Sequence, residues 1–304
     1  MKGKDLLSIS DLAPEDARRL IDKAVAMKRE GMSSVLAGRT LALLFEKPSL
    51  RTKVSFDVAM HQLGGHSVYM SQAEVGLGSR ESISDVARTL SRYVDAISAR
   101  TFAHATLEAL AEHASVPVIN ALSDREHPCQ ALADVLTVYE KKSQLEGLTL
   151  AYIGDGNNVA SSLLLACALV GIGFRIASPK GYGVGDDMAA LGRGLGPGGA
   201  EILLVESPRE AVEGADVVYT DVWTSMGQEE EAQRRRTDLA GYQVDGNLLS
   251  LAAKDAILMH PLPAHYGEEI APGLADCPQS VIFDQAENRL HIQKAILAEL
   301  VTRS

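Results

Sequence analysis

Short apolar segments alternate with segments of helical spacing along almost the whole chain, and this alternation restricts the possible folds more than any other feature. Strands that alternate with helices form parallel sheets, which helices cover on both faces. Strands are predicted at residues 39–45, 66–70, 96–100, 117–121, 148–153, 174–178, 202–205, 217–220, 256–259 and 281–283. A first helix ends near residue 29, and further helices are predicted at residues 51–63, 82–93, 106–114, 129–142, 159–170 and 287–300. The predicted fold class is therefore α/β.

A polar break at residues 141–147 interrupts the alternation, which then restarts. The chain has 304 residues, enough for two α/β domains of ordinary size, and 46% of them are apolar, enough for substantial cores. We therefore predict a first domain at residues 1–142 and a second at residues 148–285, followed by a helical segment at residues 286–304.

Three other segments are predicted to lie at the surface. Residues 72–81 are polar and contain two glycines, which favours a flexible loop. Residues 192–199 are rich in glycine and are also predicted to form a loop. Residues 229–236 are highly charged, which is typical of a solvated helix face.

Charge, cysteine content and apolar runs restrict the partners, the metal and disulfide content, and the location of the protein. The net charge of −11 and the pI of about 5.2 argue against binding to nucleic acid or to an anionic membrane. The three cysteines are scattered, with no metal-ligand spacing and no disulfide framework. The beginning of the chain has no apolar signal segment, and no apolar run approaches about 18 residues. We expect a soluble cytoplasmic protein.

The clearest binding feature lies between the first predicted strand and the helix after it. Pro48 ends the strand, and Ser49 is a good N-cap. The first turn then carries Arg51, Thr52 and Lys53, whereas acidic residues normally complement this end of the helix dipole. Backbone N–H groups, hydroxyls and a guanidinium at a helix N-terminus suit a phosphate group. The alternative is a capped helix with a solvated basic turn.

Other polar clusters also follow predicted strands, where ligands bind in open α/β sheets. They lie at residues 100–101, 127–130, 155–158, 221–227 and 260–265. Each alone is explained by ordinary loop polarity: Arg100 by an ion pair at a strand end, and His127 or Asp221 by helix capping. Together with the basic turn they make six clusters in the same topological position, which indicates a ligand site.

Two further functions have weak support. Residues 154–156 are Gly-Asp-Gly after a strand, but Val159 occupies the third glycine position of a dinucleotide fingerprint and no acidic residue ends the next strand. His260 and His265 are five residues apart among prolines, so they do not share a helix face as paired metal ligands do. We therefore predict no cofactor and no metal, and a dehydrogenase is the least supported alternative.

Several segments together resemble the aspartate/ornithine carbamoyltransferase family, and its ornithine branch in particular. They are Phe45-Glu46-Lys47-Pro48-Ser49-Leu50-Arg51-Thr52, His127-Pro128-Cys129-Gln130-Ala131-Leu132-Ala133-Asp134, Gly154-Asp155-Gly156-Asn157-Asn158, Asp221-Val222-Trp223-Thr224-Ser225-Met226-Gly227 and Glu287-Asn288-Arg289-Leu290-His291. The Ser-x-Arg-Thr and His-Pro-x-Gln motifs are shared by all transcarbamoylases. The Asp-x-x-x-Ser-Met-Gly motif is similar to the one by which the ornithine branch holds its amino acid. The resemblance covers essentially the whole chain.

The resemblance implies transfer of the carbamoyl group of carbamoyl phosphate to the δ-amine of L-ornithine, giving L-citrulline and phosphate. It implies direct attack through a tetrahedral intermediate, without metal or cofactor. It also implies two domains, one for carbamoyl phosphate and one for ornithine, with the C-terminal helix packing back on the first domain. The resemblance further implies a homotrimer or a higher assembly of trimers. It also implies a role in arginine metabolism.

The resemblance also assigns roles to individual residues. The implied catalytic residues are Arg100, His127 and Gln130. The residues implied to bind carbamoyl phosphate are Ser49, Leu50, Arg51, Thr52, Arg100, His127, Gln130, Pro261, Leu262 and Arg289. Those implied to bind ornithine are Asn158, Asp221, Ser225 and Met226. Attack by a neutral amine turns the carbonyl oxygen into an oxyanion. Hydrogen-bond donors of Arg100 and His127, which are in position before the attack, stabilise this oxyanion.

Pro261 is the main departure from the ornithine branch, which usually has a cysteine there that contacts the attacking amine. Proline offers neither a polar side chain nor an N–H group, and His-Pro-Leu-Pro is the form seen in aspartate carbamoyltransferases. The Ala264-His265 pair that follows matches the ornithine branch again. The alternatives are a carbamoyltransferase for another amine, such as aspartate or putrescine, and a non-catalytic carbamoyl-phosphate-binding homologue.

Two smaller departures concern the phosphate end. Gly76 aligns with a position where the family often has Gln or His, which reaches a neighbouring subunit's phosphate site. Lys53 replaces the commoner arginine, so it keeps the charge but not the bidentate geometry.

Overall fold

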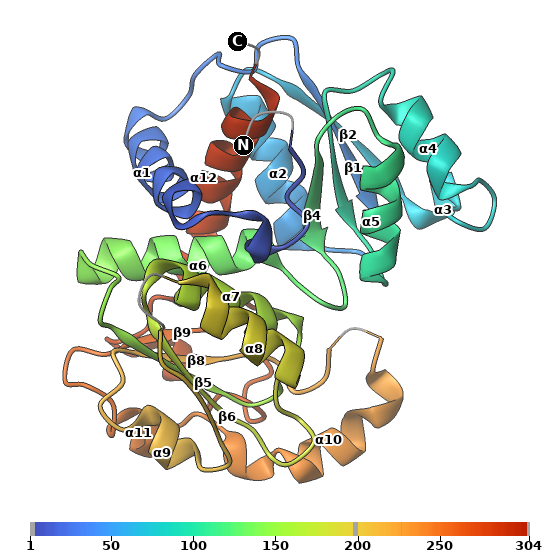
Figure 1. The fold of residues 1–304 in the computed structure, drawn as a ribbon. Coiled ribbons are helices and arrows are strands. Elements are labelled where there is room, and N and C mark those ends of the chain that lie inside the picture. Colours follow the sequence, from blue (N-terminus) through green and yellow to red (C-terminus); the bar gives the residue numbers. More distant parts are fainter. Residues whose placement is uncertain (1–3, 197–199, 226, 303–304) are drawn as a thin grey trace. The chain divides into compact units, whose positions relative to one another are not determined.

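The computed structural model describes residues 4–196, 200–225 and 227–302. The chain forms two compact units, each with its own parallel sheet (Figure 1). One unit contains Met1–Leu136 and Glu287–Ser304, and the other contains Thr137–Ala286. The α/β class predicted from the alternation is confirmed, because every pairing between the named strands is parallel.

The sheet of the first unit has the order β2-β1-β3-β4. Its strands are β1 (Thr40–Phe45), β2 (His66–Ser71), β3 (Ala96–Arg100) and β4 (Val118–Leu122). Phe45, the last residue of β1, pairs with Arg100, the last residue of β3. This register brings Arg100 beside the turn that leads into α2, because parallel strands end at the same edge of a sheet.

Helices cover both faces of this sheet, as Figure 1 shows. They are α1 (Pro14–Glu30), α2 (Leu50–Gln62), α3 (Gln72–Val75), α4 (Ile83–Leu90), α5 (His104–His113), the start of α6 (Pro128–Lys142) and most of α12 (Ile282–Val301). Val86 of α4 and Leu107 of α5 pack in one buried cluster with Leu44 and Ile97 of the sheet. Burial of such side chains is the main stabilising contribution, about 1.5–3 kcal/mol for each large apolar residue.

The C-terminal helix packs against α1, as predicted. Lys294 Nζ donates to the carbonyl oxygens of Met27 and Gly31, at 3.2 and 2.6 Å, and so caps the end of α1. Lys23 forms an ion pair with Glu299 at 2.7 Å. None of the described helices, α12 included, has the combination of length and hydrophobicity needed to cross a lipid bilayer.

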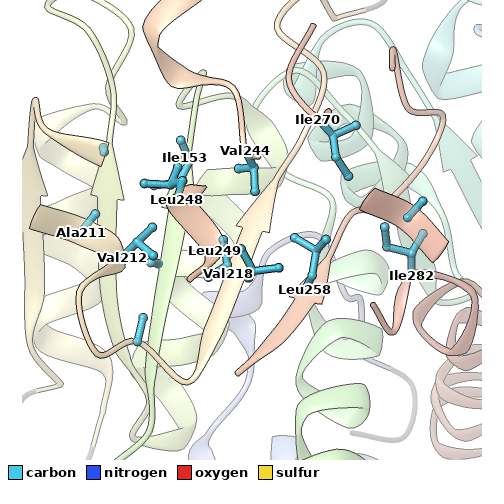
Figure 2. Packing of buried hydrophobic residues seen from close by; sticks show 14 residues of the cluster. Ile153, Ala211, Val212, Val218, Val244, Leu248, Leu249, Leu258, Ile270 and Ile282 are labelled. Atoms are coloured by element: carbon cyan, nitrogen blue, oxygen red, sulfur yellow. The ribbon is translucent and has the colours of Figure 1, made fainter. Parts of the chain in front are cut away.

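The sheet of the second unit has the order β7-β6-β5-β8-β9. Its strands are β5 (Thr149–Ile153), β6 (Gly173–Ala177), β7 (Ile202–Val205), β8 (Val217–Thr220) and β9 (Ile257–Met259). Its helices are α7 (Asn158–Val170), α8 (Asp186–Leu195), α9 (Pro208–Val212), α10 (Ala232–Asp238) and α11 (Gly246–Leu249). Figure 2 shows part of its core, in which Val218 and Leu258 of the sheet pack with Leu249 of α11. The α7 helix is apolar on all sides and accordingly buried.

Three predicted segments differ in the structure. Residues 281–283 are not a strand: α12 begins at Ile282, and a short apolar run cannot be distinguished from a buried helix start by its pattern. Residues 72–81 are not entirely loop, because α3 forms a single turn there. The α8 helix continues through Gly192 to Leu195, because a glycine lets it approach Leu164 and Ile202 closely. Residues 197–199 of the predicted loop lie outside the described residues.

Candidate active site

The N-terminus of α2 forms the first part of the candidate site. Ser49 is the N-cap, as predicted, and its Oγ accepts from the Thr52 N–H at 3.3 Å. Arg51 is half-buried and Thr52 is buried, while the Leu50 side chain is 75% exposed. The first turn holds no acidic residue. The positive end of the helix dipole and its N–H groups are therefore arranged for an external anion.

Arg100 extends from the end of β3 into the same region. Its side chain is buried, and burial together with the charges of Arg289 and Arg51 lowers the pKa of Arg100 to about 10. Its Nε is buried and has no hydrogen-bond partner among the described residues. A buried guanidinium among other guanidinium groups is stabilised by an anion, which would neutralise their repulsion.

His127 lies at the start of α6 and is also buried. Burial, followed by the charges of Arg289, Arg100 and Arg51, lowers the pKa of His127 well below its ordinary value. The imidazole is therefore neutral at pH 7, with one N–H donor and one acceptor nitrogen. A neutral donor beside the arginines can polarise a carbonyl group without adding a further charge.

Arg289 of α12 connects α2 to α6. Its Nη2 donates to Thr52 Oγ1 at 2.6 Å, and its Nη1 donates to Gln130 Oε1. Gln130 Nε2 donates to Asp134 Oδ1 at 2.8 Å. Because a carboxylate only accepts, Asp134 fixes the orientation of the Gln130 amide. Sequence reasoning assigned no role to Asp134, although its i,i+4 spacing from Gln130 on a helix was a usable signal.

We call the residues that these contacts bring together the first-unit site. They are Ser49, Arg51, Thr52, Arg100, His127, Gln130 and Arg289. Three guanidinium groups, a helix N-terminus and hydroxyls suit a phosphate dianion. The neutral His127 and the fixed Gln130 amide suit a polar group with both an acceptor and donors, such as an amide.

Gly76, at the position of the expected cross-subunit residue, ends α3 in the left-handed conformation with φ 62°. A Cβ there would lie 2.6 Å from Arg80 Cβ. The local turn therefore requires glycine.

Lys53 lies with its Nζ 3.5 Å from the centre of the Tyr69 ring.

A second polar group follows β5 and β8 in the second unit. Asp221 is buried; its Oδ2 accepts from Asn157 Nδ2 at 2.9 Å, and its Oδ1 accepts from the Val222 N–H at 2.8 Å. Burial raises the pKa of Asp221, and the nearby His260 opposes this shift. A ligand ammonium group would stabilise this carboxylate further.

Asn157 holds this aspartate in place, although no role was predicted for it; the role predicted for its neighbour Asn158 is to bind the ligand carboxylate. The Oδ1 of Asn157 caps α7 by accepting from the N–H groups of Val159 and Ala160, at 2.9 and 3.1 Å. Its amide group therefore points at Asp221. Asn158 is the first residue of α7 and is half-buried. The signal was available, because Asn before an apolar helix is a typical N-cap.

Ser225 belongs to the segment after β8, and its N–H donates to Gln228 Oε1 at 3.1 Å. Met226 lies outside the described residues. We call Asn157, Asn158, Asp221 and Ser225 the second-unit site.

The segment after β9 is fixed by a buried histidine. His260 Nδ1 accepts from the Leu262 N–H at 2.9 Å, so its Nε2–H donates to Glu269 Oε1 at 3.1 Å. These contacts set the direction of the peptide groups at Pro261 and Leu262. Pro261 can offer only its carbonyl oxygen to a ligand. Glu269 was not identified from the sequence, because its partner lies nine residues away on a different turn.

One group of side chains has the composition of a metal site. The potential ligand atoms of His265, Glu268 and Glu269 lie within 4.8 Å of one another. Glu268 already pairs with Arg236 at 2.9 Å, and Glu269 accepts from His260. A positive neighbour and an engaged carboxylate do not suit a cation, so we assign no metal to this group.

The charged segment at residues 229–236 is solvated, as predicted, with one exception. Arg234 and Arg236 of α10 are exposed, whereas Arg235 is buried. Arg235 forms an ion pair with Asp155 at 3.0 Å. The prediction was therefore wrong for Arg235, because charge content alone does not reveal which side of a short helix faces inward.

Comparison with known proteins identifies the class of this chain. Residues 4–140 match the carbamoyl-P binding domain of aspartate/ornithine carbamoyltransferase, and residues 146–300 match the Asp/Orn binding domain. The chain therefore belongs to the aspartate/ornithine carbamoyltransferase family.

Its relatives point to one branch of this family. The chain is 53% identical to the ornithine carbamoyltransferase of Hyperthermus butylicus, with 97% of this chain and 96% of that protein covered. It is 51% identical to the ornithine carbamoyltransferase of Thermus thermophilus, over 98% of this chain and 97% of the relative. The solved structure of ornithine carbamoyltransferase from Pyrococcus furiosus has a TM-score of 0.94 at 46% identity, and covers 99% of this chain and 97% of its own.

Proposed function

We propose that this protein transfers the carbamoyl group of carbamoyl phosphate to the δ-amine of L-ornithine, giving L-citrulline and phosphate. The observation that carries the proposal is the convergence of Arg51, Arg100 and Arg289 on the N-terminus of α2, beside the neutral His127. Relatives at about half identity over nearly the whole chain are ornithine carbamoyltransferases, which supports the same reaction here.

The phosphate end of the substrate is assigned to the start of α2. Ser49, Arg51 and Thr52 bind its oxygens through their side chains, and Leu50 contributes only its backbone N–H, in agreement with its exposed side chain. Arg289 holds Thr52 from the other side. The leaving phosphate keeps this positive clamp throughout the reaction, so charge that develops on the bridging oxygen is compensated.

The carbamoyl end is assigned to Arg100, His127 and Gln130. Arg100 and the N–H of the neutral His127 donate to the carbamoyl oxygen, which becomes an oxyanion when the amine attacks. Gln130 Oε1 accepts from the carbamoyl NH₂ through its second lone pair, since the first accepts from Arg289. The carbonyl groups of Pro261 and Leu262 are proposed as further acceptors for this NH₂.

The amino acid is assigned to the second-unit site. Asp221 binds the α-ammonium group, which would offset the effect of burial on its pKa. Asn158 and the backbone of Met226 bind the α-carboxylate, and Ser225 adds a hydroxyl. Asn157 fixes the Asp221 carboxylate so that one orientation is presented to the ligand.

The proposal includes a homotrimer or a larger assembly of trimers in the cytoplasm, in arginine metabolism. Exposed apolar side chains on the first unit support a protein partner: Leu50 and Val54 of α2 and Val68 of the edge strand β2. Light scattering coupled to size-exclusion chromatography tests the assembly, and a monomeric mass would contradict it.

The reaction is tested by supplying the purified protein with carbamoyl phosphate and, separately, ornithine, aspartate and putrescine. We expect citrulline from ornithine as the fastest reaction, without added metal. Faster turnover of aspartate or putrescine would overturn the ornithine assignment while leaving the transferase class in place.

Pro261 supports a second candidate, a homologue that binds carbamoyl phosphate without transferring it. The variant Pro261→Cys distinguishes the two. Little change in rate indicates that Pro261 is compatible with catalysis, as we expect, whereas a large gain from near zero favours the non-catalytic candidate.

A further inference from the structure

Arg235 lies on the buried side of α10, whereas the neighbouring arginines of this helix are exposed. Its side chain makes several contacts. Its own exposed fraction is 8%. Its Nη1 lies 3.0 Å from Asp155 Oδ2 and donates to the Trp223 carbonyl oxygen at 3.1 Å. Its Nε donates to Glu231 Oε2 at 3.0 Å, and the guanidinium carbon lies 5.3 Å from the centre of the Tyr182 ring. The planar fork of donors suits such bridging.

The two groups that Nη1 contacts flank the second-unit site. Asp155 lies two residues before Asn157, in the turn after β5, and Trp223 lies two residues after Asp221, in the segment after β8. Asn157 and Asp221 are hydrogen-bonded to each other at 2.9 Å. One guanidinium therefore ties together the two backbone segments whose side chains form this pair.

We infer that Arg235 is a positioning residue for the ornithine site, where it holds the turn after β5 and the segment after β8 at the separation that lets Asn157 fix Asp221. The inference rests on the proposed function for the identity of the ligand. Arg235 acts through the Asp155 carboxylate and the Trp223 carbonyl group and does not itself bind the amino acid.

The charges around Asp155 give this role a measurable signature. Burial raises the pKa of Asp155 to about 6, the charge of Arg235 opposes this shift, and the charges of Asp221 and Glu231 add to it. Tyr152, on β5, donates its hydroxyl proton to the Asp155 backbone oxygen at 3.0 Å. Loss of Arg235 leaves a buried carboxyl beside two other acids, so its pKa rises further and it takes up a proton nearer neutral pH.

The variant Arg235→Met tests the inference, because it removes the donors and keeps an unbranched side chain. We expect the KM for ornithine to rise about tenfold or more, since small misplacements of binding groups have effects of this size. The affinity for carbamoyl phosphate, measured by calorimetry, should stay within about twofold, because the first-unit site shares no partner with Arg235 among the described contacts. The matched control is Arg234→Met, at an exposed position of the same helix.

Two further readouts separate positioning from a general structural role. As the pH is lowered, kcat/KM for ornithine should begin to decline at a higher pH in Arg235→Met than in the unmodified protein. Adding Asp155→Asn to this variant should abolish the displacement of the pH profile, because no carboxyl is left to titrate. The ornithine KM should stay raised, because asparagine mimics the protonated Asp155 and does not restore the tie between the two segments.

An ornithine KM that is unchanged in Arg235→Met, or a loss shared equally by carbamoyl phosphate, overturns the inference. If Arg235→Met does not fold, Arg235→Lys decides the question: a raised ornithine KM supports the role of the planar fork, and an unmodified KM overturns it. An unmodified protein that forms no citrulline overturns the proposed function itself. Citrulline formation with no effect of Arg235 overturns only the positioning role.

Discussion

At the scale of single residues, the chemistry of the first-unit site follows from buried positive charge. Burial and neighbouring guanidinium groups lower the pKa values of both Arg100 and His127, with opposite consequences. Arg100, with a pKa of about 10, stays charged at pH 7 and attracts an anion, whereas His127 stays neutral and donates a hydrogen bond. The cluster therefore combines charged guanidinium donors with one neutral imidazole donor.

Replacement of Arg51 tests the phosphate assignment. Arg51→Ala should abolish detectable carbamoyl phosphate binding in calorimetry, because each charge-assisted hydrogen bond contributes roughly 1.5–3 kcal/mol. Lys53→Ala is the matched control, since Lys53 is an exposed basic residue of the same turn that lies over Tyr69. Carbamoyl phosphate affinity close to that of the unmodified protein in Arg51→Ala would show that the anion binds elsewhere.

The buried neutral His127 predicts a pH dependence of stability. Its folded pKa lies below the unfolded value of about 6.5, so the unfolded chain takes up the proton first and folding stability is lost as pH falls below that value. The variant His127→Gln lacks this proton uptake. We expect the Tm of the unmodified protein to fall relative to that of His127→Gln between pH 7 and pH 5, as measured by calorimetry. Parallel Tm curves would mean that His127 titrates normally in the folded protein.

At the scale of elements, close packing decides how α8 lies against α7 and β7. A Cβ on Gly192 would lie 2.4 Å from Leu164 Cδ2 and 2.8 Å from Ile202 Cδ1, so the helix approaches α7 and β7 only because this residue has no side chain. Gly194, two residues on, has no neighbouring atom within 4 Å of the same position. The two glycines look alike in the sequence and have opposite roles.

This contrast predicts opposite effects of two equivalent substitutions. Gly192→Ala should lower the free energy of unfolding by about 1–3 kcal/mol through overpacking. Gly194→Ala should raise it by about 0.4–1 kcal/mol, because alanine favours an exposed helix. Chemical denaturation of both variants measures the difference, and effects of the same sign would contradict the packing argument.

At the scale of the whole molecule, the C-terminal helix completes the first unit. Gln130 and Arg289 are separated by 159 residues along the chain, yet Arg289 joins Gln130 to Thr52. Lys294 secures the same helix by capping α1. We therefore expect binding at the first-unit site and docking of the end of the chain to be coupled.

The coupling predicts the behaviour of Lys294→Met. Loss of the ammonium group leaves two carbonyl groups at the end of α1 without this donor, which should lower stability by about 1–3 kcal/mol. Carbamoyl phosphate should recover part of the loss, since a ligand stabilises the state that binds it. Thermal unfolding with and without carbamoyl phosphate tests this, with Lys254→Met at an exposed position as control. Equal Tm values for both variants would exclude a docking role for Lys294.

The sequence by itself determined the α/β class, the Ser49 cap and the grouping of polar residues after strands. These features depend on neighbours within a few positions, which side-chain pattern and helix-end chemistry report directly. Only the tertiary structure decided that Arg289 reaches Thr52, that Asn157 holds Asp221, and that Arg235 is buried. Their partners lie 237, 64 and 80 residues away along the chain, so the folded sheets and the returning helix set these contacts. A local pattern marks Asn157 as a helix cap, but it does not identify Asp221 as its partner.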